Sequence, residues 1–191
     1  MDKTDDKALL EAVRTLIRGA GEDPARPGLR ETPDRFVRAW REWTSGYHEV
    51  PGEILKSFDD GAANYDELVI VRDIPVYSLC EHHLAPFFGV AHVGYLPRER
   101  IVGLSKLNRL VGALSRRLQV QERLTTQIAD TLHEALRPHG VAVMLECRHM
   151  CMESRGIRQP GAATLTSAMR GTLIADAKSR AEFLSLVGRR P

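Results

Sequence analysis

Apolar residues recur at helical spacing in the first part of the chain. Residues 4–19 carry one apolar stripe and end at glycines, which predicts an amphipathic helix. A second helix is predicted from Thr32, a threonine N-cap that precedes a proline. Over residues 44–66, proline, glycine and aspartate interrupt the chain without a sustained period, which is typical of a linker. The pattern therefore predicts a helical N-terminal region with its linker, residues 1–66, ahead of a larger domain, residues 67–191.

Strand and helix patterns follow one another in the larger domain. Apolar stripes at helical spacing predict one helix capped by Ser105 and another from Gln121 to Leu136. Two strands precede these helices, and two strands and a short helix follow them, which predicts an α+β fold with mainly antiparallel pairing. The first expected strand includes residues 68–71 and 76–79, the other strands cover 88–96, 141–151 and 162–168, and the last helix covers 179–187.

Composition and charge exclude several classes of protein. Hydrophobic residues make up 43% and charged residues 27%, which is typical of a folded globular protein. A net charge of +2 gives no bulk reason to bind nucleic acid or an anionic membrane. No apolar stretch approaches the roughly 20 residues that cross a bilayer, and the start does not read as a leader. We therefore expect a soluble cytoplasmic protein with neither a nucleic-acid partner nor a membrane partner.

Cysteine and histidine recur at metal-ligand spacing at two places. In a turn, residues three apart face the same side, so Cys80 and His83 can share a tetrahedral ion. His149 and Cys151 form a second pair, because strand alternation places residues two apart on one face. Four ligands would make a closed, structural zinc site, whereas a free histidine would leave a position for water. Spacing alone leaves both arrangements open, as well as a core cysteine pair with satisfied histidines.

The three cysteines are too few, and odd in number, for a disulfide framework. Cys147 lies on the same predicted strand face as His149 and Cys151, but it has no paired ligand of its own. We therefore expect Cys147 to be a core residue.

Two predicted helix starts carry candidate ligand-binding side chains. Ser105, Lys106 and Arg109 lie where backbone N–H groups and the helix dipole attract anions. The two cations oppose that dipole, which is easier to understand if a phosphate chain lies among them, but a solvated polar helix start is an equally good interpretation. Glu122 can accept hydrogen bonds from the amine edge of guanine, although a surface glutamate at a helix start is far commoner. No P-loop motif occurs, so a nucleotide would be held in another way.

Short motifs follow one another along nearly the whole chain. They are Gly21-Glu-Asp-Pro, Thr32-Pro-Asp-Arg35, Cys80-Glu-His-His-Leu, Gly94-Tyr-Leu-Pro, Gly103-Leu-Ser-Lys, Gln119-Val-Gln-Glu-Arg-Leu-Thr, His149-Met-Cys-Met, Arg155-Gly-Ile, Thr164-Leu-Thr-Ser and Arg180-Ala-Glu-Phe-Leu. In this order and with this spacing, they resemble the motifs of the zinc-dependent GTP cyclohydrolase I family.

The resemblance implies a catalytic Zn2+ site. The family's zinc ligands correspond to Cys80, His83 and Cys151, which leaves His82 and His149 unbound. In the family, zinc activates water for attack at C8 of the guanine ring, and the residue matching His82 donates and accepts protons. An imidazole pKa near 6.5 suits both directions of transfer at neutral pH. His149 would assist as a second proton-transfer or orienting group.

The same resemblance makes GTP the expected substrate. Glu122 corresponds to the anchor of the guanine edge. The family's triphosphate-binding positions correspond to Ser105, Lys106, Arg109, Arg155 and, as a further candidate, Arg35. The implied reaction opens the imidazole ring, releases C8 as formate, rearranges the ribose and closes a new ring. The product is 7,8-dihydroneopterin triphosphate, in the first step of tetrahydrofolate and pterin biosynthesis.

The family's fold is the tunnelling fold, an antiparallel sheet with two helices packed on one face. Its subunits join their sheets into a barrel, and two rings stack as a homodecamer with active sites between subunits. Strands with open edges agree with this implication. The chain departs from the family pattern at Arg38, where lysine is usual, and at Cys147 and Arg148, where small or uncharged residues are usual.

Two other functions compete with this interpretation. A homologue could perform only part of the chemistry, such as C8 hydrolysis, for a deazapurine or another specialised pathway, and the matched positions do not separate it. A non-catalytic, zinc-stabilised nucleotide-binding protein would need neither His82 nor Glu122. A nucleoside zinc deaminase is disfavoured, because its His-x-Glu and Pro-Cys-x-x-Cys signature is missing.

Overall fold

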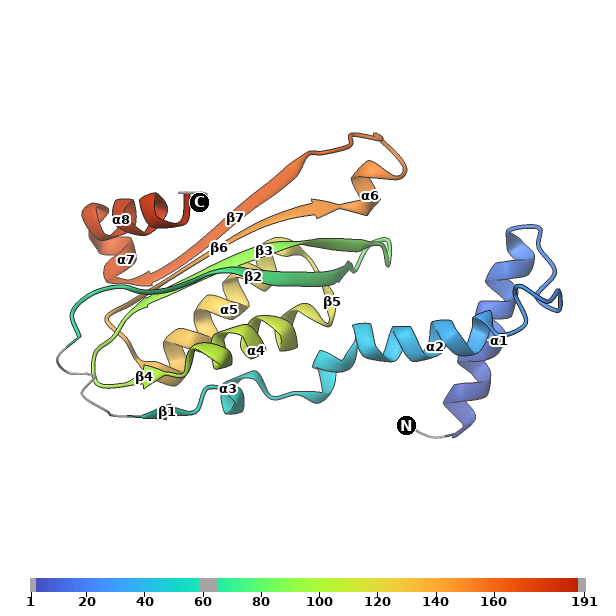
Figure 1. Ribbon diagram of the computed structural model, residues 1–191, viewed down its shortest axis with the longest axis horizontal. Coiled ribbons are helices and arrows are strands. Elements are labelled where there is room, and N and C mark those ends of the chain that lie inside the picture. The colour runs from blue at the N-terminus through green and yellow to red at the C-terminus, as the bar shows by residue number, and fades with distance from the viewer. Residues whose placement is uncertain (1–2, 59–64, 189–191) are drawn as a thin grey trace. The chain divides into compact units, whose positions relative to one another are not determined.

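The computed structural model describes residues 3–58 and 65–188 of the chain (Figure 1). Two compact units make up the chain, Met1–Thr44 and Ser45–Pro191. The division expected after residue 66 falls within the second unit and stays a prediction. None of the described helices is long and apolar enough to cross a membrane.

The first unit contains two helices that pack together, α1 (Lys3–Gly19) and α2 (Thr32–Trp43). An ion pair between Asp6 of α1 and Arg41 of α2 joins them. Both predicted helices are confirmed. The start of α2 is one residue earlier than predicted, with Glu31 rather than Thr32 in the N-cap position, a difference that lies within the fraying of helix ends.

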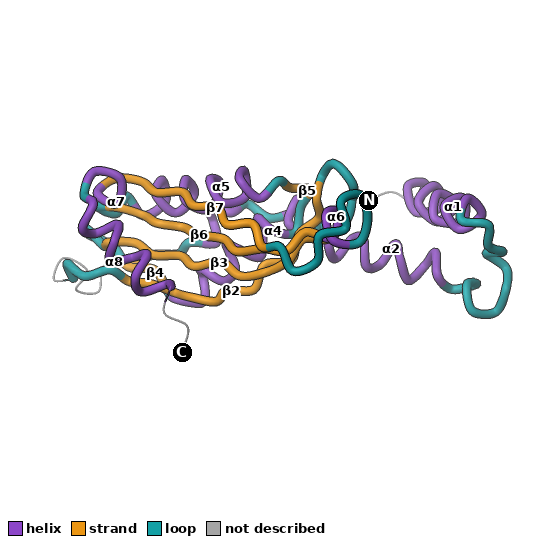
Figure 2. The backbone as a smooth tube through the Cα atoms, turned by 90° about the horizontal axis from the view of Figure 1, so that it is seen from above, coloured by secondary structure: helices purple, strands orange, loops and turns teal. Residues whose placement is uncertain are grey.

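The second unit is built on a five-stranded sheet in the order β5-β2-β3-β6-β7. All neighbours in it are antiparallel except β5, which pairs in parallel with the end of β2. Figure 2 shows the long strands β2, β3, β6 and β7 side by side. The strands are β2 (Val69–Cys80), β3 (Pro86–Leu96), β5 (Leu118–Gln119), β6 (Gly140–His149) and β7 (Ala163–Gly171).

Helices α4 (Leu104–Ser115) and α5 (Gln121–Leu136) cover one face of this sheet (Figure 1). Their buried stripes meet the inward side chains of β2, β3 and β6 in the main core. A smaller cluster around Phe183 packs α8 (Ala177–Gly188) against the opposite face. The α+β class, with two helices on one face of a mainly antiparallel sheet, is confirmed. The side chains at the centre of the main core include Val76, Phe87, Val93, Leu107, Leu110, Leu124, Ile128, Leu132, Val143 and Leu145.

Short elements complete the second unit. The predicted linker contains a 3-10 helix, η1 (Ser45–His48), and a short helix, α3 (Pro51–Ile54). Two further short helices are α6, directly after β6, and α7, directly after β7. A separate two-stranded antiparallel sheet joins β1 to β4. The bounds of these four elements are Met150–Glu153 for α6, Thr172–Ala175 for α7, Ser57–Phe58 for β1 and Ile101–Val102 for β4.

The segments expected to be strand at 68–71 and 76–79 both contribute to β2. The structure corrects two details of the sequence interpretation. The helix expected to be capped by Ser105 begins at Leu104, with Gly103 in the N-cap position and no side-chain cap. The strand expected over 141–151 ends at His149, because the chain turns there into α6.

Strand β2 contains a β-bulge. The register shifts between Val71 and Ile74, and Asp73 adopts a left-handed backbone with φ 57°. The Asp73 N–H donates to Nδ1 of the buried His92 at 3.2 Å, and burial lowers the pKa of His92. Pro75 is tolerated in mid-strand because β5 pairs only with the last two residues of β2.

The bulge also reverses which residues of β2 face the helices. Before it, the odd-numbered Val69 and Val71 pack against the main core. After it, the even-numbered Ile74, Val76 and Cys80 do so. One extra residue in the strand therefore moves the inward set by one position.

Candidate metal centre and active site

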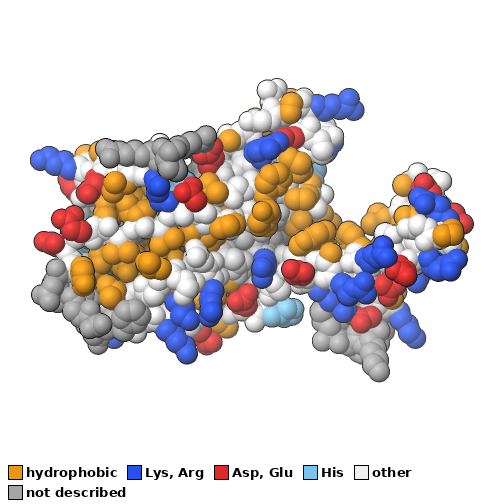
Figure 3. Space-filling model, viewed as in Figure 1, with side chains coloured by type: hydrophobic (Ala, Val, Ile, Leu, Met, Phe, Trp, Pro, Cys, Tyr) orange, Lys and Arg blue, Asp and Glu red, His pale blue; other side chains and the backbone are white. Residues whose placement is uncertain are grey.

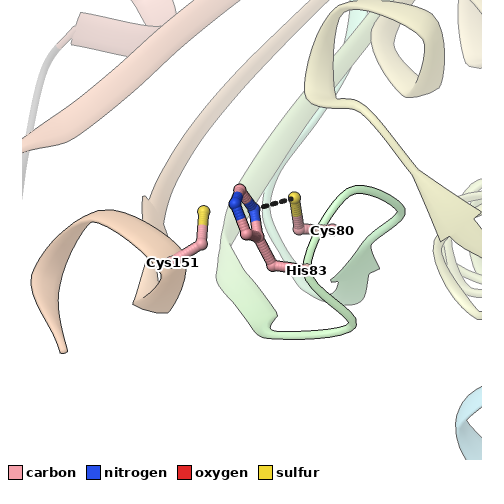
Figure 4. Close-up of side chains that lie close together, drawn as sticks. All are labelled: Cys80, His83 and Cys151. Atoms are coloured by element: carbon pink, nitrogen blue, oxygen red, sulfur yellow. Dashed lines mark hydrogen bonds between the residues drawn. The ribbon is translucent and has the colours of Figure 1, made fainter. Parts of the chain in front are cut away.

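Cys80, His83 and Cys151 converge at one end of the sheet. Cys80 is the last residue of β2, His83 lies in the turn to β3, and Cys151 lies in α6. One ligand atom from each lies within 4.8 Å of the other two. Figure 4 shows the three side chains facing one another, with Cys80 Sγ 3.7 Å from His83 Nδ1. These three side chains, all within the described residues, form a group that could hold a metal ion.

Backbone hydrogen bonds fix the turn that presents His83. The Cys80 N–H donates to the Ala85 carbonyl, and the Leu84 N–H donates to the Cys80 carbonyl, both at 2.8 Å. Leu84 adopts φ 51°, which is uncommon for a residue other than glycine and is held only where the surroundings enforce it. The Glu81 N–H donates to the Gln119 carbonyl at 3.0 Å, which attaches the turn to β5.

The second arm of the group arrives on a helix rather than on a strand. Because β6 ends at His149, Cys151 reaches the group from the first turn of α6. His149 and Cys151 therefore lie near each other because the chain turns from strand to helix between them. Alternation along a strand is not the cause. His149 is not a member of the three-residue group.

The surroundings of the Cys151 thiol favour its neutral form when no cation is bound. Burial raises the pKa of the Cys151 thiol, and the neighbouring Cys80 sulfur raises it further, while the charge of Arg155 opposes the rise. Two neighbouring sulfurs resist joint ionisation, whereas a bound cation favours the thiolate form of both. Arg155 also reaches the group directly, with its Nη1 3.2 Å from His83 Nε2.

His82 lies beside the group but is exposed. Its side chain is 64% exposed, and its Nδ1 lies 3.9 Å from Cys80 Sγ. Glu81 lies next to it, with Oε1 3.9 Å from His82 Nε2. An ion pair to Arg123 of α5 holds Glu81 and lowers the pKa of its carboxyl. His82 can therefore reach a bound molecule without leaving the turn.

His149 is held more firmly than His82. Its ring stacks on Phe87, with centroids 4.8 Å apart and planes at 10°. Its Nε2 lies 2.8 Å from Oε1 of Gln121, the first residue of α5. Burial lowers the pKa of His149, and the charge of Glu122 opposes this shift. The neutral form of the His149 imidazole is thus favoured, and the exposed carboxylate of Glu122 lies nearby.

The fold brings together only part of the predicted site. Ser105, Lys106 and Arg109 lie in the first turns of α4. Cys80 pairs with Gln119, just after the other end of that helix, so about 15 Å of helix separates the two places. Figure 1 shows one end of α4 near β4 and the other end toward β5.

Arg35 belongs to the first unit. There it forms an ion pair with Glu31 at 2.5 Å, one turn earlier on the chain.

Sequence reasoning missed Gln121 and Phe87 as partners of His149. The available signal was a glutamine next to Glu122 at a predicted helix start, but no pattern indicated that its side chain points inward. Cys147 was predicted to be a core residue, and this is confirmed, because its side chain is fully buried and burial raises its pKa to about 12.

Comparison with known proteins identifies the family. The GTP cyclohydrolase I family profile matches residues 9–188. A GTP cyclohydrolase 1 of Nitrosospira multiformis is 60% identical over 97% of both chains. Another, of a Janthinobacterium species, is 60% identical over 92% of this chain and 89% of its own. A crystal structure of the archaeosine synthase QueF-Like in the apo form aligns with a TM-score of 0.42 and 17% identity, over 55% of this chain and 93% of its own. On the strength of the family profile and these two relatives, the chain belongs to the GTP cyclohydrolase I family.

Proposed function

We propose that this protein hydrolyses GTP at C8, releases formate and forms 7,8-dihydroneopterin triphosphate, in the first step of tetrahydrofolate and pterin biosynthesis. One observation carries the proposal: three metal-capable side chains converge, with two histidines beside them and outside their group. Relatives that share 60% of their residues with this chain carry the name GTP cyclohydrolase 1, which supports the same reaction.

The proposed metal is Zn2+, held by Cys80, His83 and Cys151. Two thiolates and one imidazole form a ligand set that suits zinc, at bond lengths of about 2.0 to 2.3 Å. The spread of the three ligand atoms, within 4.8 Å, fits one ion after small side-chain movements. When bound with three protein ligands, zinc supplies the Lewis acidity that makes water a nucleophile near neutral pH.

The two histidines divide the proton transfers. His82 is exposed beside the metal ligands and exchanges protons with the reacting base. His149 is favoured in its neutral form and is fixed by stacking, so it orients the substrate and accepts or returns a proton.

The guanine base is proposed to dock on Glu122. Its exposed carboxylate, at the start of α5, can accept two hydrogen bonds from the N1–H and the exocyclic amine. This carboxylate lies close enough to His149 to influence its pKa. A base anchored there would therefore present its imidazole ring toward the histidines, and Arg155 would meet the negatively charged phosphate end.

We infer that the remaining phosphate ligands come from a second copy of the chain. Ser105, Lys106 and Arg109 lie too far along α4 to serve the metal group of their own chain. Apolar side chains gather at several places on the surface of the second unit (Figure 3), and Tyr77 and Leu165 are 71% and 60% exposed. Exposed apolar patches and the outer edge of β7 both suit a homo-oligomer, which we propose to be a decamer with sites between subunits.

GTP turnover is the direct test of this function. Zinc-loaded protein incubated with GTP is expected to release formate and to form a product that becomes fluorescent after oxidation. Formate without the fluorescent product would favour a homologue that performs partial chemistry. If zinc-loaded protein forms no product, the result would favour a nucleotide-binding protein and contradict the enzymatic proposal.

Mixed assemblies test whether two chains share one site. Cys151→Ala and Lys106→Ala are each expected to lose activity alone. If each site combines residues of two chains, co-expression in equal amounts should restore about one quarter of the wild-type activity. The matched control is a mixture of Cys151→Ala with Cys80→Ala, whose defects fall in the same half of the site and should not complement. Equal recovery in both mixtures, or in neither, would contradict a shared site.

A further inference from the structure

Gln121 is buried at the point where α5, β6 and β7 meet, and it contacts His149 directly. Its residue is 1% exposed. Its Oε1 lies 2.8 Å from His149 Nε2. On the other side, its Nε2 donates to the carbonyls of Thr164 at 2.8 Å and Leu145 at 3.3 Å, and to Thr166 Oγ1 at 3.0 Å. This side chain therefore joins a candidate catalytic residue to two strands.

The two carbonyls determine which way the amide points. A carbonyl oxygen only accepts hydrogen bonds, so the atom facing Thr164 and Leu145 must be the NH2 group. The reversed amide would place two oxygens 2.8 Å apart and would leave buried polar groups unpaired, which is unfavourable. The amide oxygen of Gln121 therefore faces His149.

A chain of hydroxyl groups supports the same orientation. Thr125 Oγ1 donates its only hydrogen to the backbone carbonyl of Gln121 at 2.7 Å. The 2.6 Å contact between Thr125 and Thr166 must then use the Thr166 hydrogen. With its own hydrogen committed, the Thr166 oxygen accepts from the Gln121 NH2 group. The two hydrogens of the Gln121 NH2 group are shared among three acceptors, so neither is left to donate to His149.

We propose that Gln121 is a positioning residue that keeps a hydrogen on His149 Nε2 and leaves Nδ1 as the nitrogen that exchanges protons with the substrate. An amide oxygen can only accept, so Nε2 must donate to it. Because Nε2 keeps its hydrogen in both the neutral and the charged ring, only the proton on Nδ1 can move. Phe87 stacks on the ring and holds its plane while Gln121 sets its rotation.

The catalytic role of Gln121 rests on the proposed function, but the position of the hydrogen on His149 can be measured independently of GTP turnover. The position of the hydrogen can be measured by solid-state NMR of zinc-loaded protein labelled with 15N-histidine, in which the His149 signals are identified by their loss in His149→Asn. The expected result is a protonated Nε2 and, in neutral rings, a bare Nδ1. A hydrogen on Nδ1 with a bare Nε2 would overturn the proposal, whatever the activity of the protein.

Gln121→Met tests the consequence for catalysis. Methionine fills the volume without an acceptor oxygen, so the His149 hydrogen should distribute between the two nitrogens. Turnover should fall about 10- to 100-fold, as for loss of other contacts that orient a histidine, while KM for GTP and zinc content change little. Gln127→Met, on the same helix, is the matched control, because its amide oxygen accepts from Gln119 and not from a histidine, and it should keep wild-type turnover.

The failures of the two proposals can be told apart. If Gln121→Met folds and keeps both the wild-type hydrogen position and the wild-type kcat, the positioning role is wrong. If wild-type protein with zinc does not turn over GTP, the proposed function fails, yet the NMR measurement still decides where the His149 hydrogen lies.

Discussion

Replacing His82 with alanine is expected to abolish GTP turnover while leaving the metal bound. The imidazole is outside the metal-capable group, and its exposed side chain contributes little packing. Loss of a positioned acid–base group typically reduces the rate about 100- to 10 000-fold. Steady-state kinetics together with elemental analysis of the purified protein measure both quantities.

His139→Ala is a suitable control for the His82 variant. His139 is exposed just before β6, and its backbone N–H donates to the Leu96 carbonyl, at the end of β3 far from the proposed metal ligands. Its replacement should change neither turnover nor metal content. If His82→Ala keeps wild-type turnover with its metal in place, the role of proton donor and acceptor must belong to another residue.

Cys151→Ala is expected to lose both the metal and the activity. The variant leaves one sulfur and one imidazole, which are too few ligands for a stable zinc site. The effect should exceed the roughly 100-fold loss that follows removal of an outer contact to a metal ligand. Metal content after dialysis and the rate of GTP turnover are the measurements.

Cys147→Ala provides a matched control from the same stretch of chain. Its side chain is fully buried in the core, so the variant should lose about 1–3 kcal/mol of stability through the cavity it leaves. It should keep its metal and its turnover. If Cys151→Ala instead retains stoichiometric zinc, a different residue must supply the third ligand, and the open site assumed for catalysis would have to be redrawn.

Much of the fold follows from short-range patterns in the sequence. The helix predicted from Gln121 to Leu136 is α5 with the same bounds, because its apolar spacing is regular and Pro138 and Gly140 prevent continuation. The Cys80 and His83 pair also follows from local geometry, since the turn between two antiparallel strands is short and closed by its own backbone.

Other features depend on distant parts of the chain. The inward direction of Gln121 depends on carbonyls of β6 and β7, which no local pattern reveals. The phosphate candidates of α4 and the metal ligands each satisfy their local rules, but only the three-dimensional structure shows that one helix length separates them. A left-handed Asp73 has no strong local signal, so the register shift within β2 could not be predicted.

The bulge at Asp73 also determines which single-codon insertions and deletions the protein tolerates in this strand. A regular strand running from Val71 would turn Cys80 away from α4 and α5, and the one extra residue of the bulge corrects this. An in-frame loss of codon 73 would remove the bulge and the extra residue together, and would leave Cys80 on its present face. A gain of one codon between Val71 and Cys80 would rotate that cysteine to the opposite face. Insertions here should therefore behave as null alleles although every ligand codon survives, whereas the single-codon deletion should not.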